Sequence, residues 1–252
     1  MEQSLIKDNI AIILVDPQIP ENIGAAARAM NNMGINRLIL VNPKNPDKDR
    51  MLRAGTVHSV DIIDNIIIHG SLEEAIGSFS YIAGTTARLG TMRHAMTSPQ
   101  TLAENLIDIS QNNDIAIMFG PEDRGLSNEH LQYCHTITTI PTSDFSSLNL
   151  AQAVLIVCYE IFRAGMKKSK STPPRLANNF ELEGMYEHLK DVLLKIGFLN
   201  PQNPDHWLLY VRRFFSRLPL RAREVRIVRG ICRQIDWYTG KRLEDIEKKN
   251  RV

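Results

Sequence analysis

Residues 10–41 read IAIILV-DPQIPENIGAAARAMNNMGIN-RLILV, and this stretch decides the fold. The runs Ile10–Val15 and Arg37–Val41 are short and rich in Ile, Leu and Val, a pattern typical of buried strands. Between them, Asn22 to Met33 has alanine-rich helical periodicity and ends before Gly34. Two buried strands joined by a helix predict a parallel βαβ unit.

The same alternation continues along the chain to about residue 165. Four further runs predict strands: Asn65–His69, Ser80–Gly84, Ile115–Phe119 and Thr136–Ile140. Helical patterns lie between them: a capping box at Ser71, a segment from Pro99 to Ser110, and an apolar helix from Leu148 to Ala164 ending at Gly165. We therefore expect an α/β domain over residues 1–165, with a mostly parallel sheet covered on both faces.

The chain beyond residue 165 has no strand pattern. Residues 166–180 are polar and basic with two prolines, which predicts a linker. Residues 181–252 carry three apolar stripes at helical spacing, which predict a small all-helical extension. The stripes are Met185, Leu189, Leu193, Ile196 and Leu199; Trp207, Val211, Phe214 and Leu218; and Leu220, Ile227, Ile231, Ile235 and Tyr238.

Charge divides the chain in the same place. Residues 1–162 carry 10 Lys/Arg against 18 Asp/Glu, a net charge of −8, whereas residues 163–252 carry 20 against 10, a net charge of +10. The basic side chains are densest between residues 212 and 233, where they are all arginines, and arginine forms bidentate contacts with phosphate. This pattern favours nucleic-acid binding, although a solvated helix face with intramolecular partners would give it too. The candidate RNA-binding residues are Arg212, Arg213, Arg226, Arg229 and Arg233.

Several classes of protein are excluded by missing patterns. The apolar runs are too short to span a bilayer, and the N-terminus lacks the pattern of a signal peptide. The three cysteines form no C-x-x-C pair, and the seven histidines are dispersed, so we expect no metal site and a location in the cytoplasm. No G-x-G-x-x-G occurs, and the loop Gly120–Gly125 lacks the Lys-Ser/Thr of a P-loop.

Three predicted strand ends lead into loops of small or polar residues. They are Gly84–Arg88, Gly120–Gly125 and Pro141–Ser147, the last leading into Leu148 and Asn149. In an open α/β sheet, ligands bind beyond the carboxyl ends of the strands. Loops without a cationic lining suit a ligand without phosphate, such as a nucleoside with an amino-acid tail. Each loop alone is equally compatible with an ordinary turn, and Ser147 with a helix cap.

A fourth segment, Asn22–Arg28, places an arginine on a helix among alanines. Asn22 can cap that helix. Arg28 has small neighbours and is free to reach into a cleft, although a lone helical arginine is more often a surface ion-pair partner.

Together these segments resemble the SPOUT superfamily of RNA methyltransferases. The first motif is similar to Pro20–Arg28, the second to Phe119–Ser127, and the third to Ile140–Ala151. The segment Gly84–Arg88 and the basic helical extension resemble most the TrmJ-type tRNA (cytidine/uridine-2′-O-)-methyltransferases. That subgroup methylates the ribose 2′-hydroxyl of nucleotide 32 in the tRNA anticodon loop.

The resemblance implies a trefoil-knotted α/β domain, a homodimer without a membrane partner, and S-adenosylmethionine as methyl donor. By motif match, the donor is surrounded by Thr85, Thr86, Ala87, Gly120, Ile140, Ser147, Leu148 and Asn149. The implied catalytic residues are Arg28, Asn22, Glu122, Ser147 and Asn149. We interpret Arg28 as a cation that orients the ribose, because arginine stays protonated in proteins.

The sequence leaves three alternatives open. One is 2′-O-methylation of ribosomal RNA or of another tRNA position, which the same motifs fit. Another is a non-catalytic RNA-binding protein on the same fold, and a third is a small-molecule enzyme with a basic tail. Which subunit of a dimer supplies Arg28 to a given site is also open.

Overall fold

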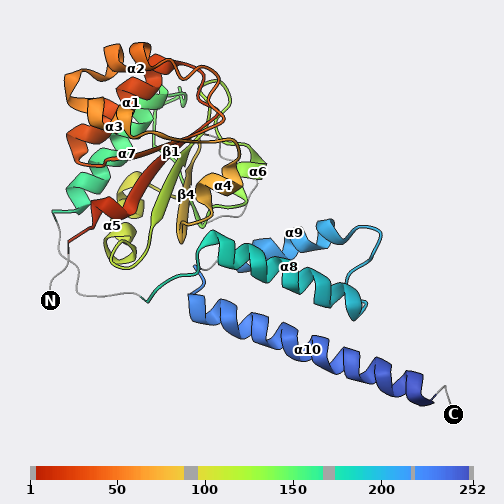
Figure 1. Ribbon diagram of the computed structural model, residues 1–252. Coiled ribbons are helices and arrows are strands. Elements are labelled where there is room, and N and C mark those ends of the chain that lie inside the picture. The colour runs from red at the N-terminus through yellow and green to blue at the C-terminus, as the bar shows by residue number, and fades with distance from the viewer. Residues whose placement is uncertain (1–3, 88–95, 167–173, 217–218, 250–252) are drawn as a thin grey trace. The chain divides into compact units, whose positions relative to one another are not determined.

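The computed structural model describes residues 4–87, 96–166, 174–216 and 219–249. The chain forms two compact units, Met1–Arg175 and Leu176–Val252. The predicted α/β architecture followed by helices is confirmed (Figure 1). Among the described residues, no helix combines the length and apolarity needed to cross a membrane.

The first unit is built on a seven-stranded sheet in the order β3-β2-β1-β6-β4-β7-β5. All its strand pairs are parallel. The strands are β1 (Ile10–Val15), β2 (Arg37–Val41), β3 (Ile67–His69), β4 (Tyr81–Thr85), β5 (Met96–Thr97), β6 (Ile115–Phe119) and β7 (Thr136–Thr138). Every residue of β1 and β6 is buried, as expected for central strands covered on both faces.

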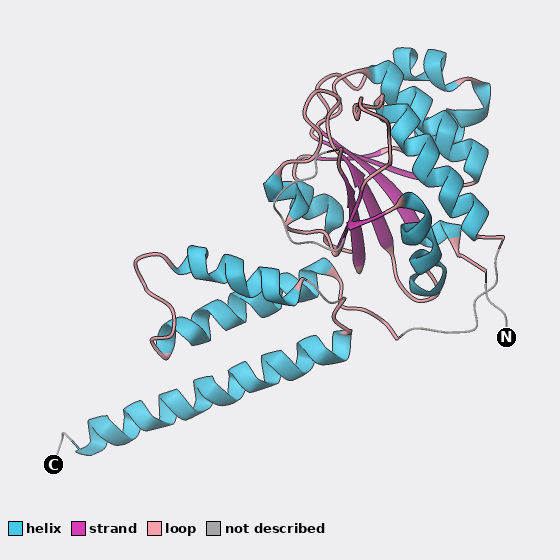
Figure 2. Cartoon of the chain, turned by 180° about the vertical axis from the view of Figure 1, so that it is seen from behind, coloured by secondary structure: helices cyan, strands magenta, loops and turns pink. Residues whose placement is uncertain are grey.

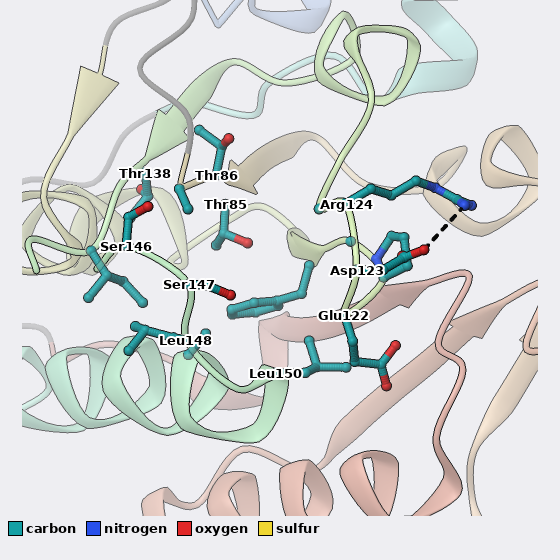
Figure 3. A pocket seen from close by; sticks show the side chains of 17 residues that line it. Thr85, Thr86, Glu122, Asp123, Arg124, Thr138, Ser146, Ser147, Leu148 and Leu150 are labelled. Atoms are coloured by element: carbon teal, nitrogen blue, oxygen red, sulfur yellow. Dashed lines mark ion pairs between the residues drawn. The ribbon is translucent and has the colours of Figure 1, made fainter. Parts of the chain in front are cut away.

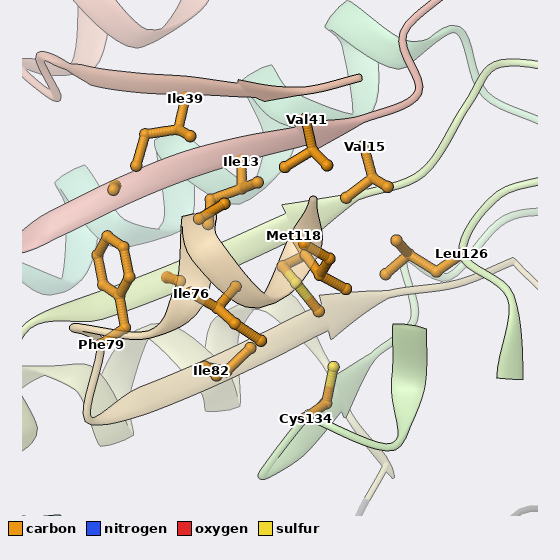
Figure 4. Packing of buried hydrophobic residues seen from close by; sticks show 14 of the residues in the cluster. Ile13, Val15, Ile39, Val41, Ile76, Phe79, Ile82, Met118, Leu126 and Cys134 are labelled. Atoms are coloured by element: carbon orange, nitrogen blue, oxygen red, sulfur yellow. The ribbon is translucent and has the colours of Figure 1, made fainter. Parts of the chain in front are cut away.

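Helices cover both faces of the sheet, as the view from behind also shows (Figure 2). They are α1 (Pro20–Met33), α2 (Lys48–Gly55), α3 (Val60–Asp64), α4 (Leu72–Ile76), α5 (Pro99–Ile109), α6 (Asn128–Leu131) and α7 (Leu150–Ala164), with 3-10 turns at Lys7–Asn9 and Val57–Ser59. Helix α7 packs between α1 and α5 on one face. On the other face, Ala11, Ile13 and Val15 of β1 share a core with α4 and α6 (Figure 4).

The predicted bounds of β1, β2 and β6 are confirmed, whereas the edges of the sheet differ. The predicted strand Asn65–His69 is shortened to β3, whose Ile67 and Ile68 are exposed. The predicted strand Thr136–Ile140 ends at Thr138, and the two-residue β5 was not predicted. Edge strands have few neighbours to bury them, so their sequence pattern is weak.

The second unit consists of α8 (Asn179–Lys195), α9 (Pro204–Phe215) and α10 (Ala222–Lys249). Its core includes Met185 and Tyr186 of α8, Leu208 of α9 and Val225 of α10. Arg212 is used inside this unit: its guanidinium pairs with the Glu183 carboxylate and lies 4.6 Å from the centroid of the Tyr186 ring.

The third predicted stripe has the wrong register. On α10, Val225 and Cys232 are buried, whereas Ile227, Ile231 and Tyr238 are more than half exposed. Phe214 of the second stripe is also exposed, and Trp207 and Leu218 lie outside the residues whose side chains are described. A helix with apolar residues on two faces does not show by periodicity alone which face is buried.

His135 joins β4 to the start of β7. Its Nδ1 accepts a hydrogen bond from the Ile82 backbone N–H (3.1 Å), and its ring stacks on Tyr81 at a centroid distance of 5.3 Å. Desolvation lowers the pKa of His135 from 6.5 to about 4. The folded protein therefore holds His135 in its neutral form, with Nδ1 as the hydrogen-bond acceptor for β4.

This shift makes the first unit sensitive to acid. Between about pH 6.5 and pH 4 the unfolded chain binds a proton at His135 that the folded chain does not. The free energy of unfolding should therefore fall by about 1.4 kcal/mol per pH unit in this window. Urea titrations at pH 7.5 and pH 5 measure it. His135→Asn keeps an acceptor without a titrating group, so it should lose less stability on acidification than the wild type. An equal loss in both would contradict the assignment.

Candidate active site

A pocket lies where β4, β6 and β7 end. Its cavity volume is about 270 Å³. Three loops supply the walls (Figure 3). The lining comprises Thr85, Thr86 and Ala87 after β4; Phe119, Gly120, Pro121, Glu122, Asp123, Arg124 and Gly125 after β6; and Thr138, Ile140, Ser146, Ser147, Leu148, Leu150 and Ala153 from β7 to α7. The sequence-predicted loops therefore meet at one point.

Gly120 is required for the shape of this pocket. A Cβ on Gly120 would lie 2.2 Å from the carbonyl carbon of Gly125 and from the backbone nitrogen of Leu126. The loop after β6 therefore closes on itself without room for a side chain. Thr85 borders the same loop from β4, and its hydroxyl donates to the Met118 carbonyl (2.9 Å). Backbone groups thus form much of the wall.

Asn22, Glu122 and Asn149 form one hydrogen-bonded chain beside the pocket. The Asn149 amide donates to Asn22 Oδ1 (2.9 Å), and the Asn22 amide donates to Glu122 Oε1 (2.9 Å). Glu122 also accepts from the backbone N–H groups of Gln18 (3.0 Å) and Ile19 (3.2 Å). Both carboxylate oxygens are therefore used, and three segments far apart in sequence are joined at the start of α1.

The prediction that Asn22 caps α1 is wrong, as is the alternative that Ser147 caps α7, and the observed caps explain the Asn149–Asn22–Glu122 hydrogen bonds. Helix α1 begins at Pro20, with Ile19 as a cap residue that makes no side-chain bond. Asn22 therefore lies inside the first turn, and its amide is available for Glu122 and Asn149. Helix α7 begins at Leu150, and its cap is Asn149, which accepts from the backbone N–H groups of Ala151 and Gln152. Ser147 caps nothing and lines the pocket.

The charged residues of the β6 loop are bound by the loop that precedes α1. The Gln18 amide donates to Asp123 Oδ1 (2.7 Å), and Arg124 pairs with Asp16 (3.3 Å). Arg124 also lies 3.8 Å from Asp123 (Figure 3). Asp16 and Gln18 were missed by sequence reasoning, because an Asp and a Gln in a loop carry no motif. Their contacts hold the loop that lines the pocket.

Arg28 does not line the pocket. It lies on α1, six residues beyond Asn22, or about 9 Å along the helix axis. Its side chain is exposed, and within the described ranges it has no hydrogen bond or ion pair. The ion pair that a lone helical arginine usually makes is therefore not found there. Arg88, at the end of the predicted β4 loop, lies outside the described residues.

The predicted RNA-binding arginines fall into two groups. Arg213 on α9 and Arg226, Arg229 and Arg233 on α10 are exposed. Arg212 is engaged with Glu183 and Tyr186, so it fits the intramolecular alternative that the sequence left open. Among the residues described, no group of three or more His, Cys, Asp or Glu side chains is arranged to hold a metal ion.

The model of the SpoU rRNA methylase family matches residues 9–159. The chain belongs to the SpoU methylase family. A second model, the C-terminal domain of the tRNA methyltransferase TrmJ, matches residues 180–249 of this SpoU methylase. The predicted resemblance is thereby confirmed for both parts of the chain.

Curated relatives extend over nearly the whole SpoU methylase. It is 38% identical over 239 residues to a tRNA (cytidine/uridine/adenosine-2′-O-)-methyltransferase TrmJ of Pseudomonas aeruginosa, covering 89% of this chain and 92% of the relative. It is 36% identical over 238 residues to a tRNA (cytidine/uridine-2′-O-)-methyltransferase TrmJ of Pectobacterium atrosepticum, covering 90% and 97%. The crystal structure of TrmJ from Z. mobilis matches with a TM-score of 0.77 at 32% identity, covering 90% of this chain and 98% of that one.

S-adenosylmethionine is the cofactor of this SpoU methylase. The pocket fits it. Among the described residues, the charged side chains of the lining are Glu122, Asp123 and Arg124, and they are bound to the loop before α1 or to one another rather than offered to a phosphate. Ser146, Ser147, backbone groups and the apolar side chains of Ile140 and Leu148 also line the pocket, and they suit a nucleoside and an amino-acid tail.

Proposed function

We propose that this methyltransferase acts on a ribose 2′-hydroxyl of tRNA, at nucleotide 32 of the anticodon loop. The observation that carries the proposal is the hydrogen-bonded chain Asn149–Asn22–Glu122 beside a pocket whose described charged residues are all paired. The match of residues 180–249 to the C-terminal domain of TrmJ favours tRNA over ribosomal RNA. The curated relatives named above are tRNA 2′-O-methyltransferases.

The proposed mechanism needs orientation more than acid–base chemistry. When bound, the cofactor would supply a methyl group on a sulfonium, whose methyl–sulfur bond breaks on transfer and leaves a neutral thioether, a good leaving group. The protein aligns the 2′-oxygen with the methyl carbon, and alignment of this kind lowers a barrier by several kcal/mol. Ser147 borders the pocket from the side of α7, Asn149 caps that helix, and the bond between the Asn149 and Asn22 side chains joins it to α1. Arg28 is the cation that orients the ribose and stabilises the negative charge developing on the 2′-oxygen. The 2′-proton leaves to solvent.

Synthetic tRNA tests whether nucleotide 32 is the methyl acceptor. A tRNA with a 2′-deoxy sugar at nucleotide 32 should accept no methyl group, because the acceptor oxygen is missing. The matched control is the same tRNA with the 2′-deoxy sugar at nucleotide 38, across the same loop, which should be methylated at the wild-type rate. Transfer is followed with labelled S-adenosylmethionine. Full transfer to the 32-deoxy tRNA would place the target elsewhere.

We further propose a homodimer that uses α1 and α7. Leu155 and Tyr159 of α7 lie one turn apart, and both are exposed, at 39% and 48%. Helix α1, which carries Arg28, packs beside α7. Because Arg28 does not line the pocket of its own chain, the dimer would deliver Arg28 to the partner's pocket.

Mixed dimers test the delivery of Arg28. An Arg28→Ala chain has an intact pocket, and a Gly120→Ala chain has an intact Arg28. Co-expressed chains should regain about a quarter of the wild-type activity, because half of the dimers are mixed and each has one complete site. Each variant alone is the control. If the mixture stays as inactive as its components, Arg28 acts within its own chain.

The cysteines support a reducing compartment. Cys134, Cys158 and Cys232 are buried and unpaired. Free buried thiols are typical of proteins that do not pass through an oxidising compartment. A cytoplasmic location, where tRNA is found, is therefore part of the proposal.

A further inference from the structure

One face of α9 carries aromatic rings that are exposed rather than buried in the core of the second unit. Tyr210 is 50% exposed and Phe214 is 68% exposed. His206 and Arg213 are exposed beside them. The spacing of these four residues places them along one side of the helix. Leu208 and Phe215 of the same helix pack into the core of the second unit, so the exposed rings lie on the opposite side.

The rings of this face are held by their neighbours. His206 meets Tyr210 edge-on at a centroid distance of 5.2 Å, and the Arg213 guanidinium lies 5.9 Å from the Tyr210 ring centroid. Phe214 meets the core residue Phe215 edge-on at 5.3 Å. Rings fixed in this way lose little further freedom when a flat ligand stacks on them.

We propose that His206, Tyr210, Arg213 and Phe214, the α9 aromatic face, bind unpaired bases of the RNA substrate by stacking. The inference rests on the proposed function, in which the helical unit holds tRNA. Exposed aromatic rings interleaved with arginine are the elements that bind single-stranded RNA, because every base has a flat π-face and every phosphate a negative charge. The anticodon loop offers such bases.

Charge favours RNA over a protein partner on this face. Residues 163–252 carry a net charge of +10, which attracts a polyanion and opposes the approach of a second basic copy. On α10, the exposed residues that lie among the arginines, Ile227 and Ile231, are aliphatic and offer no stacking surface. Its exposed rings, Trp237 and Tyr238, follow these arginines, and the Trp237 ring already has the Lys241 ammonium 5.0 Å from its centroid. The stacking surface is therefore assigned to α9.

Two substitutions in the full-length protein separate stacking from charge. Phe214→Leu keeps an apolar side chain of similar exposure but removes the ring, and Arg213→Gln removes one charge. The probe is a single-stranded RNA labelled with 2-aminopurine, titrated at several salt concentrations. Phe214→Leu should weaken binding at least about fivefold at every salt concentration, with an unchanged salt dependence. Arg213→Gln should reduce the slope of log K against log salt concentration by about 0.7.

Phe180→Leu is the matched control. Phe180 is 62% exposed on α8, but its neighbours in sequence are Glu181 and Glu183 rather than arginine. Its substitution should leave binding within twofold of the wild type, and Phe214→Trp should retain wild-type affinity. Thermal melting followed by circular dichroism verifies that all variants fold.

Three outcomes would overturn the proposal. They are wild-type affinity in Phe214→Leu, an equal loss in Phe180→Leu, and a change of oligomeric mass in Phe214→Leu, which would assign the face to a protein contact. Methyl transfer to intact tRNA is measured separately on the wild type. An active enzyme that ignores the labelled RNA overturns the stacking surface alone, whereas an enzyme that binds it but transfers no methyl group overturns the proposed function alone.

Discussion

Replacing Arg28 by alanine should reduce methyl transfer to tRNA by about 10²- to 10³-fold while leaving the affinity for S-adenosylmethionine within twofold. The size is that expected for removing one group that stabilises charge developing in a transition state. Cofactor binding should survive because the three loops of one chain form the cofactor pocket, and Arg28 is proposed to meet the ribose rather than the cofactor. Folding should survive because the side chain is exposed and makes no hydrogen bond or ion pair within the described residues. Single-turnover transfer and calorimetric cofactor binding measure the two quantities.

A second exposed arginine of the same unit serves as the control. Arg53 lies on α2, and its hydrogen bond within the described part of the chain is to the Asp49 carbonyl of its own helix. Arg53→Ala should keep the wild-type rate of methyl transfer. Arg28→Lys should recover part of the lost rate, because lysine keeps the positive charge but lacks the planar guanidinium that forms two parallel hydrogen bonds. Full transfer by Arg28→Ala would remove Arg28 from the mechanism. Loss of cofactor binding would make its role structural.

Replacing Gly120 by alanine should lower the affinity for S-adenosylmethionine by at least about 10²-fold. The added Cβ would lie 2.2 Å from two backbone atoms of Gly125 and Leu126, and neither can move without shifting the loop that lines the pocket. Displacement of a binding loop by about 1 Å has effects of this size. The same variant should leave the second unit folded, because Leu176–Val252 is a separate compact unit.

Gly70→Ala is the matched control for this prediction. The same methyl group at Gly70 meets no atom within 4 Å, and Gly70 does not line the cofactor pocket. Its cofactor affinity should equal that of the wild type. Tight cofactor binding by Gly120→Ala, measured by calorimetry, would show that the loop does not form the cofactor wall.

The centre of the sheet was predictable because its strands are buried on both sides. The runs at Ile10–Val15 and Arg37–Val41 contain apolar residues at nearly every position, and both have the predicted bounds. The edge strand β3 was predicted from the apolar run at residues 66–68, but it is shorter than predicted, and the two-residue β5 has no such run. On α10 the periodicity gave the wrong buried face, because apolar residues occur on both sides of that helix.

The loops that form the pocket were predictable, but the hydrogen bonds and ion pairs that connect them were not. Motif order placed Thr85, Gly120 and Ser147 at neighbouring strand ends, and all three line one pocket. The bond between Asn149 and Asn22 joins residues 127 positions apart, which no local pattern encodes. The contacts of Asp16 and Gln18 were missed for the same reason. The trefoil knot stays a prediction of the resemblance.

The most direct test of the central claim is methyl transfer from labelled S-adenosylmethionine to unmodified bulk tRNA, followed by nuclease mapping and mass spectrometry of the nucleosides. We expect a 2′-O-methylated nucleotide in the anticodon loop, produced by the wild type and absent with Arg28→Ala. Label confined to ribosomal RNA, or no label on any RNA while the cofactor is bound, would contradict the account.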